Sequence, residues 1–299
     1  MEDIYKRCNL CSRKCLINRY ERNGVCGANA KVKIARAALH YWEEPCLSGD
    51  NGSGTVFFSN CSLKCIFCQN KKISTNGFGK EIELEELSNI YLNLQKQGAN
   101  NINLVTPTHY VPSIIKSLDI AKKNGLKLPI VYNTSSYETK ETIKLLNGNI
   151  DIYLPDLKYY NDEYAYNYSN VKDYFKIATD NIKEMYNQVG KNIFDENGIM
   201  TKGVIVRVLL LPNHVEDAKK ILKYLYETYK DNIYISIMNQ YTPVECIEEY
   251  IDLNRKVKEE EYDELINYAC DLGMINAFIQ EGETQSESFI PDFNLDGIS

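Results

Sequence analysis

The chain has 299 residues, of which 44% are hydrophobic and 25% are charged, and its formal net charge is −7. This composition is that of a globular protein long enough for one α/β barrel or two small domains. No apolar run is long enough to span a membrane, and the acidic balance without a basic block argues against broad nucleic-acid binding.

The first fifty residues are rich in cysteine and in turn-forming residues. No secretory signal precedes them, so we expect a cytoplasmic protein whose clustered cysteines bind metal and do not form disulfides. Four cysteines have the spacing C-x2-C-x3-C-x10-C, and these are Cys8, Cys11, Cys15 and Cys26. Four thiolates suit a structural zinc ion or an auxiliary iron–sulfur cluster, and the absence of any metal is the third alternative. We therefore predict a small N-terminal metal-binding module over residues 1–50.

From Gly54 onward, short β-branched or aromatic runs alternate with segments of helical period, which is typical of β/α units around a parallel sheet. The predicted strands are 55–59, 101–105, 129–132, 150–154, 204–210 and 233–237, and the clearest helices are 84–97, 111–124 and 171–189. Six such units predict an α/β fold, a partial (β/α)6 barrel over residues 51–245. We expect residues 246–299 to form a mainly helical C-terminal extension that packs on the barrel.

Polar residues follow the predicted strand ends. Because β/α barrels build their active sites on that face, these residues predict a shared cleft. Those that we expect to bind a cofactor there are Thr106, Thr108, Asn133, Asp156, Lys158, Arg207 and Gln240.

A cysteine loop follows the first predicted strand. Cys61, Cys65 and Cys68 have the spacing C-x3-C-x2-C. A cubane cluster has four irons, so three thiolates leave one iron open for a ligand that is not protein. If S-adenosylmethionine binds that iron, an electron from the reduced cluster can cleave its carbon–sulfur bond and give a 5′-deoxyadenosyl radical. A zinc knuckle or three core thiols are the alternative interpretations of this spacing.

At this loop the chain resembles the radical S-adenosylmethionine superfamily, whose signature is C-x3-C-x2-C with an aromatic residue before the last cysteine. Phe67 fits that position, which in the family packs near the adenine. The resemblance covers about residues 52–245. It implies a partial barrel, a 4Fe-4S cluster on the three cysteines and S-adenosylmethionine as the second cofactor.

Other segments are similar to an uncharacterised group described as pyruvate formate-lyase activating proteins. They are residues 8–15, Glu43-Glu44-Pro45-Cys46, Cys68-Gln69-Asn70, Tyr132-Asn133-Thr134, residues 154–158 and Met238-Asn239-Gln240-Tyr241-Thr242-Pro243. The likeness adds Asn70 to the expected cofactor contacts, and Asp156-Leu157-Lys158 resembles an element near the cofactor carboxylate in glycyl-radical activating enzymes. One departure is Thr106-Pro107-Thr108-His109, which stands where many members have Gly-Gly-Glu for the cofactor's amino group. The two Thr hydroxyls or backbone carbonyls would replace that carboxylate.

The resemblance implies a radical S-adenosylmethionine oxidoreductase that abstracts hydrogen, with an electron donor such as flavodoxin or ferredoxin. Activation of a glycyl-radical enzyme is the first hypothesis for its target. Radical modification of a small metabolite or a peptide side chain is the alternative. A third hypothesis, a non-enzymatic iron–sulfur electron carrier, conflicts with the open coordination position, because such carriers surround their clusters with four protein ligands.

Overall fold

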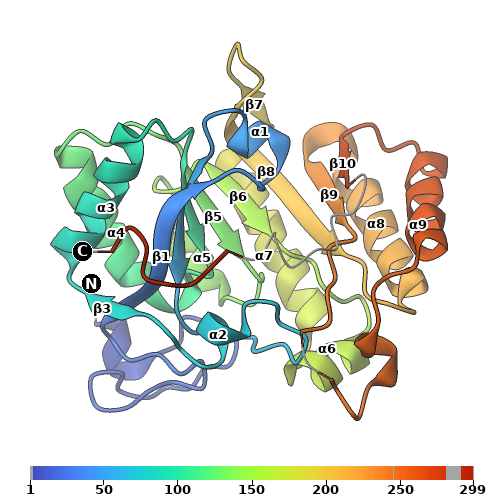
Figure 1. The fold of residues 1–299 in the computed structure, drawn as a ribbon, viewed down its shortest axis with the longest axis horizontal. Helices are drawn as coiled ribbons and strands as arrows, with labels where there is room; N and C mark the ends of the chain where they lie inside the picture. Colours follow the sequence, from blue (N-terminus) through green and yellow to red (C-terminus); the bar gives the residue numbers. More distant parts are fainter. Residues whose placement is uncertain (1–2, 245, 281–290, 299) are drawn as a thin grey trace.

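The computed structural model describes residues 3–244, 246–280 and 291–298, and one curved sheet dominates it (Figure 1). The strand order is β10-β9-β8-β6-β5-β4-β2-β1-β3. Neighbours among the six strands in the middle of this order run parallel. They are β2 (Ser53–Phe58), β4 (Ile102–Val105), β5 (Ile130–Thr134), β6 (Ile152–Pro155), β8 (Met200–Leu209) and β9 (Tyr234–Met238). The predicted partial barrel of six parallel strands is therefore confirmed.

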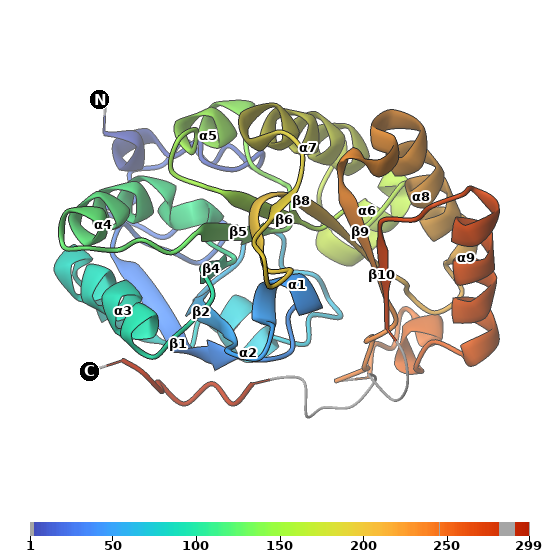
Figure 2. The same ribbon diagram turned by 90° about the horizontal axis from the view of Figure 1, so that it is seen from above.

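Helices cover one side of the sheet, as Figure 2 shows. They are α3 (Leu84–Lys96), α4 (Val111–Lys123), α5 (Lys140–Leu145), α7 (Tyr174–Val189) and α8 (Val215–Tyr229). Helix α7 illustrates the cause, because its residues at helical spacing, Ala178, Ile182, Met185 and Val189, are all buried. These apolar faces and the buried strands form the main core.

The predicted helix 171–189 begins later than expected. Residues Asp162–Ser169 form a separate helix, α6, and α7 begins at Tyr174. Asn170 and Asp173, between the two helices, have positive φ angles of 48° and 53°. A residue in the left-handed region cannot continue a right-handed helix, so the chain breaks there.

Several elements lie outside the predicted strands and helices. Strand β1 (Val32–His40) pairs antiparallel with β2 and with β3 (Lys80–Ile82). The sheet therefore contains residues from the predicted N-terminal module, residues 1–50, as well as from the barrel. Strand β7 (Ile193–Phe194) pairs antiparallel with β8. The remaining short helices are η1 (Ile4–Arg7), α1 (Pro45–Ser48), α2 (Lys71–Ser74), η2 (Thr108–Tyr110), η3 (Lys230–Asn232) and η4 (Ile251–Asn254). Short runs of this kind carry too little periodicity to be recognised locally.

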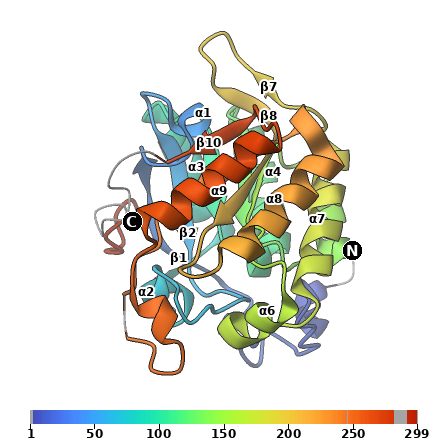
Figure 3. The ribbon, with the colours of Figure 1, turned by 90° about the vertical axis from the view of Figure 1, so that its right-hand side faces the viewer.

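The C-terminal extension contains helix α9 (Glu259–Asp271), which packs beside α8 (Figure 3). It also adds strand β10 (Ala277–Ile279), parallel to β9. Residues 291–298 then lie along β1, where the N–H of Leu295 donates to the Ala35 carbonyl at 3.1 Å. No helix within the described ranges is both long and apolar enough to cross a membrane.

Candidate active site

A cavity of about 230 Å³ lies at the carboxyl ends of the parallel strands. All but two of the residues expected at the cluster and cofactor line it, although they come from six different loops or strands. Those lining residues are Cys61, Cys65, Cys68, Asn70, Thr106, Asn133, Asp156, Lys158, Arg207 and Gln240. The parallel arrangement brings the ends of β2, β4, β5, β6, β8 and β9 together, and this is the physical reason that one cavity collects them.

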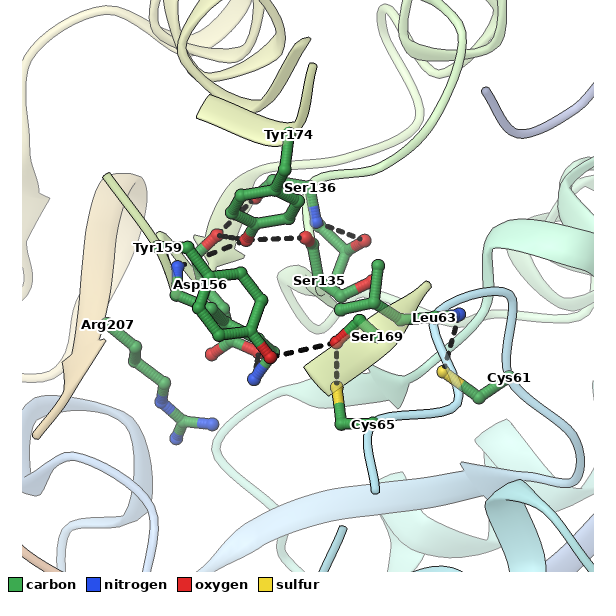
Figure 4. Close-up of polar contacts among 12 residues, drawn as sticks. Cys61, Leu63, Cys65, Ser135, Ser136, Asp156, Tyr159, Ser169, Tyr174 and Arg207 are labelled. Atoms are coloured by element: carbon green, nitrogen blue, oxygen red, sulfur yellow. Dashed lines mark hydrogen bonds and ion pairs between the residues drawn. The ribbon is translucent and has the colours of Figure 1, made fainter. Parts of the chain in front are cut away.

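Each sulfur of the cysteine loop accepts one hydrogen bond from the surrounding protein. The Sγ of Cys61 accepts from the N–H of Leu63 at 3.4 Å, and the Sγ of Cys65 accepts from Ser169 Oγ at 3.1 Å (Figure 4). The Sγ of Cys68 accepts from Ser74 Oγ at 3.2 Å. Donors directed at sulfur favour the thiolate form, which is the form that binds metal.

Burial has the opposite effect on the free thiols. Burial, and after it the charge of the neighbouring Cys65, raises the pKa of Cys61 to about 12. The pKa of Cys68 is also raised, first by burial and then by Cys65. Binding of a metal group must therefore displace protons from these thiols, which couples cluster assembly to pH.

Three cysteines suit a cubane, which can bind three thiolates and leave one iron open. Sulfurs around one zinc ion meet at a point about 2.3 Å away. A cubane binds each thiolate on a different iron, so its ligands need not meet at one point. Three neighbouring thiols in one loop, each accepting a hydrogen bond, suit the larger group.

An ion pair lies beside the cysteine loop. The Nζ of Lys158 lies 2.8 Å from Asp156 Oδ2, and both side chains are largely buried. Burial lowers the pKa of Lys158, but the charges of Asp156 and Cys65 outweigh it and raise the pKa overall. The ammonium group is thus kept positive next to a predicted cluster ligand. Figure 4 shows the backbone of Asp156 held by Tyr174 and Ser136, whose hydroxyls donate to the Asp156 carbonyl at 3.2 and 2.7 Å.

Arg207 is bound by two carboxylates that the sequence analysis did not assign to the site. Its Nε donates to Glu44 Oε1 at 2.7 Å and its Nη2 to Glu44 Oε2 at 2.8 Å, while Nη2 also contacts Glu43. Burial raises the pKa of Glu44, but the charge and hydrogen bonds of Arg207 exceed that effect and lower it. The two adjacent glutamates before Pro45 were the sequence signal for these carboxylates. Nothing in the neighbouring sequence indicated that they contact a residue on β8.

Phe67 and Thr108 do not line the cavity. The ring of Phe67 is buried between Tyr168 and Tyr241, with centroid distances of 6.3 and 5.8 Å. The hydroxyl of Thr108 is buried and donates to Glu138 Oε1 at 2.6 Å. Burial raises the pKa of Glu138, which also accepts from Tyr132 at 3.2 Å. The hydroxyl of Thr108 therefore donates to a buried carboxyl group, and the expected contact of Thr108 with the cofactor stays a prediction.

The four N-terminal cysteines lie together but outside the cavity. Cys8, Cys11 and Cys26 are buried and Cys15 is partly buried. Burial, and to a smaller extent the charges of Cys26, Cys15 and Cys8, raises the pKa of Cys11 to about 12. The thiols are close enough to shift one another's pKa values. Among the described residues, no set of side chains is arranged around a single metal ion.

A family model agrees with this geometry. The model described as "Radical SAM superfamily" matches residues 55–225, more than half of the chain. The chain belongs to the radical SAM superfamily. Enzymes of this superfamily use a 4Fe-4S cluster and S-adenosylmethionine, so this protein is a radical SAM enzyme. It is also 32% identical over 280 residues to the uncharacterized protein MJ0674 of Methanocaldococcus jannaschii, covering 90% of this chain and 75% of that one.

Solved structures share the radical SAM fold. A radical SAM methyltransferase from Sphaerobacter thermophilus is similar with a TM-score of 0.54 and 14% identity, over 77% of this chain and 67% of that one. Streptococcus suis SuiB, bound to the precursor peptide SuiA, gives a TM-score of 0.51 and 17% identity, over 75% of this chain. This chain covers 47% of SuiB, about half its length. At these identities the likeness concerns the fold alone.

Proposed function

We propose that this radical SAM enzyme holds its 4Fe-4S cluster on Cys61, Cys65 and Cys68 and cleaves S-adenosylmethionine reductively to abstract hydrogen. The observation that carries the proposal is the set of three sulfurs on one cavity wall, each accepting a hydrogen bond. When bound, the two cofactors supply a 5′-deoxyadenosyl radical. The chain supplies binding, orientation and a site with limited access to water.

Polar groups around the cavity are suited to orienting the cofactor. Asn70, Asn133 and Gln240 provide amide donors and acceptors, and Thr106 provides a hydroxyl. Arg207 contacts Glu43 and Glu44 through Nε and Nη2, so Nη1 is the end that a carboxylate of the cofactor would meet. Lys158 places a positive charge beside Cys65, which would favour the more negative, reduced form of the cluster.

Cofactor cleavage is the direct test. The protein is reconstituted with iron and sulfide without oxygen, reduced, and assayed for 5′-deoxyadenosine and methionine. We expect both products from the wild type and from Cys270→Ala, an exposed control cysteine, and neither from Cys65→Ala. The proposal would be contradicted if Cys65→Ala formed as much product as the wild type. It would also be contradicted if the paramagnetic resonance spectrum of the reduced cluster did not change on addition of S-adenosylmethionine.

For the target, we propose a backbone glycine of a partner enzyme. The support is the Asp156-Leu157-Lys158 element, which forms a buried ion pair on the cavity wall. The reduced protein with S-adenosylmethionine should then produce a glycyl signal by electron paramagnetic resonance in a candidate partner. A flavodoxin or a ferredoxin would serve as the electron donor, and replacing dithionite by each reduced donor checks that part.

A small substrate is the second candidate, and one observation favours it. Pro291 lines the cavity, and the ring of Phe293 packs on Phe57 with a centroid distance of 5.4 Å. Residues 291–298 therefore narrow the access to the cavity from the open side of the barrel. Deuterium transfer from a labelled metabolite or peptide into 5′-deoxyadenosine would support this candidate, while a glycyl signal without such transfer would favour the first.

We also propose that Cys8, Cys11, Cys15 and Cys26 hold either zinc or an auxiliary iron–sulfur cluster. The support is that the four thiols lie near one another and that this set supplies a fourth protein ligand, which the three-cysteine loop lacks. A structural zinc would stabilise the N-terminal module, whereas a second cluster would add a redox centre. Zinc and iron counts on the same anaerobic sample distinguish them.

A further inference from the structure

Arg13 lies between two cysteines of the N-terminal module, yet its side chain contacts the cluster loop. Its Nε donates to the carbonyl of Ser62 at 2.6 Å and its Nη2 to the carbonyl of Leu63 at 3.1 Å. The same guanidinium also reaches the end of α6, where Nη2 donates to Ser169 O and Nη1 to Asn170 O, both at 2.9 Å. One side chain thus joins two segments that are about a hundred residues apart.

These two segments supply the donors to two cluster ligands. Leu63 donates through its backbone N–H to Cys61, and Ser169 donates through its hydroxyl to Cys65. Figure 4 shows both contacts. A planar guanidinium has five N–H donors in a fixed fork, so four bonds to carbonyls hold the two backbones in one relative position. Because all four acceptors are neutral carbonyls, the contribution of Arg13 here is geometric.

The backbone of Arg13 is itself anchored on the barrel. The N–H of Ser12 donates to the carbonyl of Tyr137 at 2.9 Å, and the hydroxyl of Ser12 donates to the carbonyl of Glu138 at 2.8 Å. The N–H of Thr139 donates to the Leu10 carbonyl at 3.1 Å. The segment that contains Cys11 is therefore fixed to the loop after β5 on one side and to the cluster loop on the other.

A second contact joins the module to the cluster loop. Gly27, next to Cys26, has a φ angle of +93°, and a Cβ there would come within 2.7 Å of Asn60 Nδ2. Asn60 precedes Cys61 and also has a positive φ, 77°. The N-terminal module consequently contacts the cluster loop at Arg13 and at Gly27.

We propose that Arg13 is a positioning residue for the cluster loop, through which the N-terminal cysteine module sets the geometry around Cys61 and Cys65. The inference rests on the proposed function, because it concerns the cluster on that loop. Arg13 lies between two cysteines of the module, Cys11 and Cys15. The proposal therefore implies that loss of the module's metal makes Arg13 more mobile and disturbs the cluster, although the module's metal and the cluster do not touch.

The test compares Arg13→Gln and Arg13→Lys with Arg22→Gln, which removes an exposed arginine from the same module. The first readout is amide hydrogen exchange over residues 61–68 in the protein as purified. We expect exchange there to accelerate by about tenfold or more in both Arg13 variants, since the loss of charge-assisted hydrogen bonds favours local opening. Exchange in α4 should stay unchanged and serves as the internal check that the barrel is folded.

The second readout is the reduced cluster of the reconstituted protein. Both Arg13 variants should change its reduction potential and its paramagnetic resonance spectrum with S-adenosylmethionine, whereas Arg22→Gln should not. Arg13→Lys keeps the charge but not the fork, so recovery of wild-type behaviour in that variant would overturn the geometric role. Wild-type exchange over residues 61–68 in Arg13→Gln would also overturn the inference.

The two proposals fail in different ways. If wild-type protein assembles no cluster or cleaves no S-adenosylmethionine, the proposed function fails, while the exchange comparison still tests Arg13. If the wild type cleaves the cofactor and the Arg13 variants match Arg22→Gln in exchange and potential, only the role of Arg13 fails. Removal of the module's metal by a chelator should reproduce the exchange pattern of Arg13→Gln.

Discussion

The hydroxyl of Ser169 donates to the Sγ of Cys65 at 3.1 Å and contacts the hydroxyl of Tyr159 at 2.8 Å (Figure 4). A residue at the end of α6 thus interacts directly with a predicted cluster ligand, 104 positions earlier in the chain. Hydrogen bonds to ligand sulfur reduce the electron density on it and make the cluster easier to reduce.

We expect Ser169→Ala to lower the reduction potential of the cluster. A hydrogen bond worth about 1 kcal/mol corresponds to about 40 mV for a one-electron couple. Ser74→Ala, which removes the donor to Cys68, should act in the same direction. Ser117→Ala removes a buried hydroxyl that donates to Ile114 O and is the control. Spectroelectrochemical titration measures all three, and a potential raised by Ser169→Ala would contradict the argument.

Arg207→Met should destabilise the protein by roughly 3–5 kcal/mol at neutral pH, because it leaves Glu43 and Glu44 buried together without a cation. At lower pH those carboxyl groups take up protons, so the loss of stability should shrink. Urea unfolding at pH 7.5 and 5.5 checks both statements. Lys176→Met removes an exposed ion pair with Asp180 and should leave the free energy of unfolding nearly unchanged.

His109 should make the protein sensitive to acid. Its Nε2 donates to the Ser59 carbonyl at 2.8 Å, and its buried Nδ1 has no partner among the described residues. Burial and the nearby charge of Arg19 lower the pKa of His109 to about 3. Between the usual pKa near 6.5 and this value, the unfolded chain binds a proton that the folded chain does not. Stability is thus highest above pH 6.5 and falls as the pH decreases.

The expected slope for His109 is at most about 1.4 kcal/mol per pH unit. His109→Gln retains an N–H donor for Ser59 but does not titrate, so its free energy of unfolding should vary less between pH 7.5 and 5.5. Urea unfolding at several pH values compares the two proteins. Identical pH dependence in wild type and variant would exclude the contribution of His109.

Metal counts should separate the two cysteine groups. The triple variant Cys61→Ala, Cys65→Ala, Cys68→Ala should retain only the metal of the N-terminal module, either about one zinc or about four irons per chain. Adding Cys11→Ser and Cys26→Ser should remove that remainder. Elemental analysis after anaerobic purification measures both, and a triple variant without zinc or iron would contradict a metal in the module.

The C-x3-C-x2-C spacing and the alternation of short apolar runs with helical periods were enough to predict the cysteine loop, the six parallel strands and the polar residues at their ends. These signals are local, and a parallel strand order places successive strand ends side by side. Strand β1 and the break between α6 and α7 were missed, because pairing and two left-handed residues decided them.

Only the tertiary structure decided which groups surround the predicted site residues. Thr108 turns to Glu138, Arg207 is bound by Glu43 and Glu44, and Arg13 reaches the cluster loop from the other cysteine module. Each contact joins residues that are distant in the chain, and no spacing in the sequence encodes their meeting. The sequence by itself determined the chemistry at the cysteine loop, while chain packing decided the charges and hydrogen bonds that adjust it.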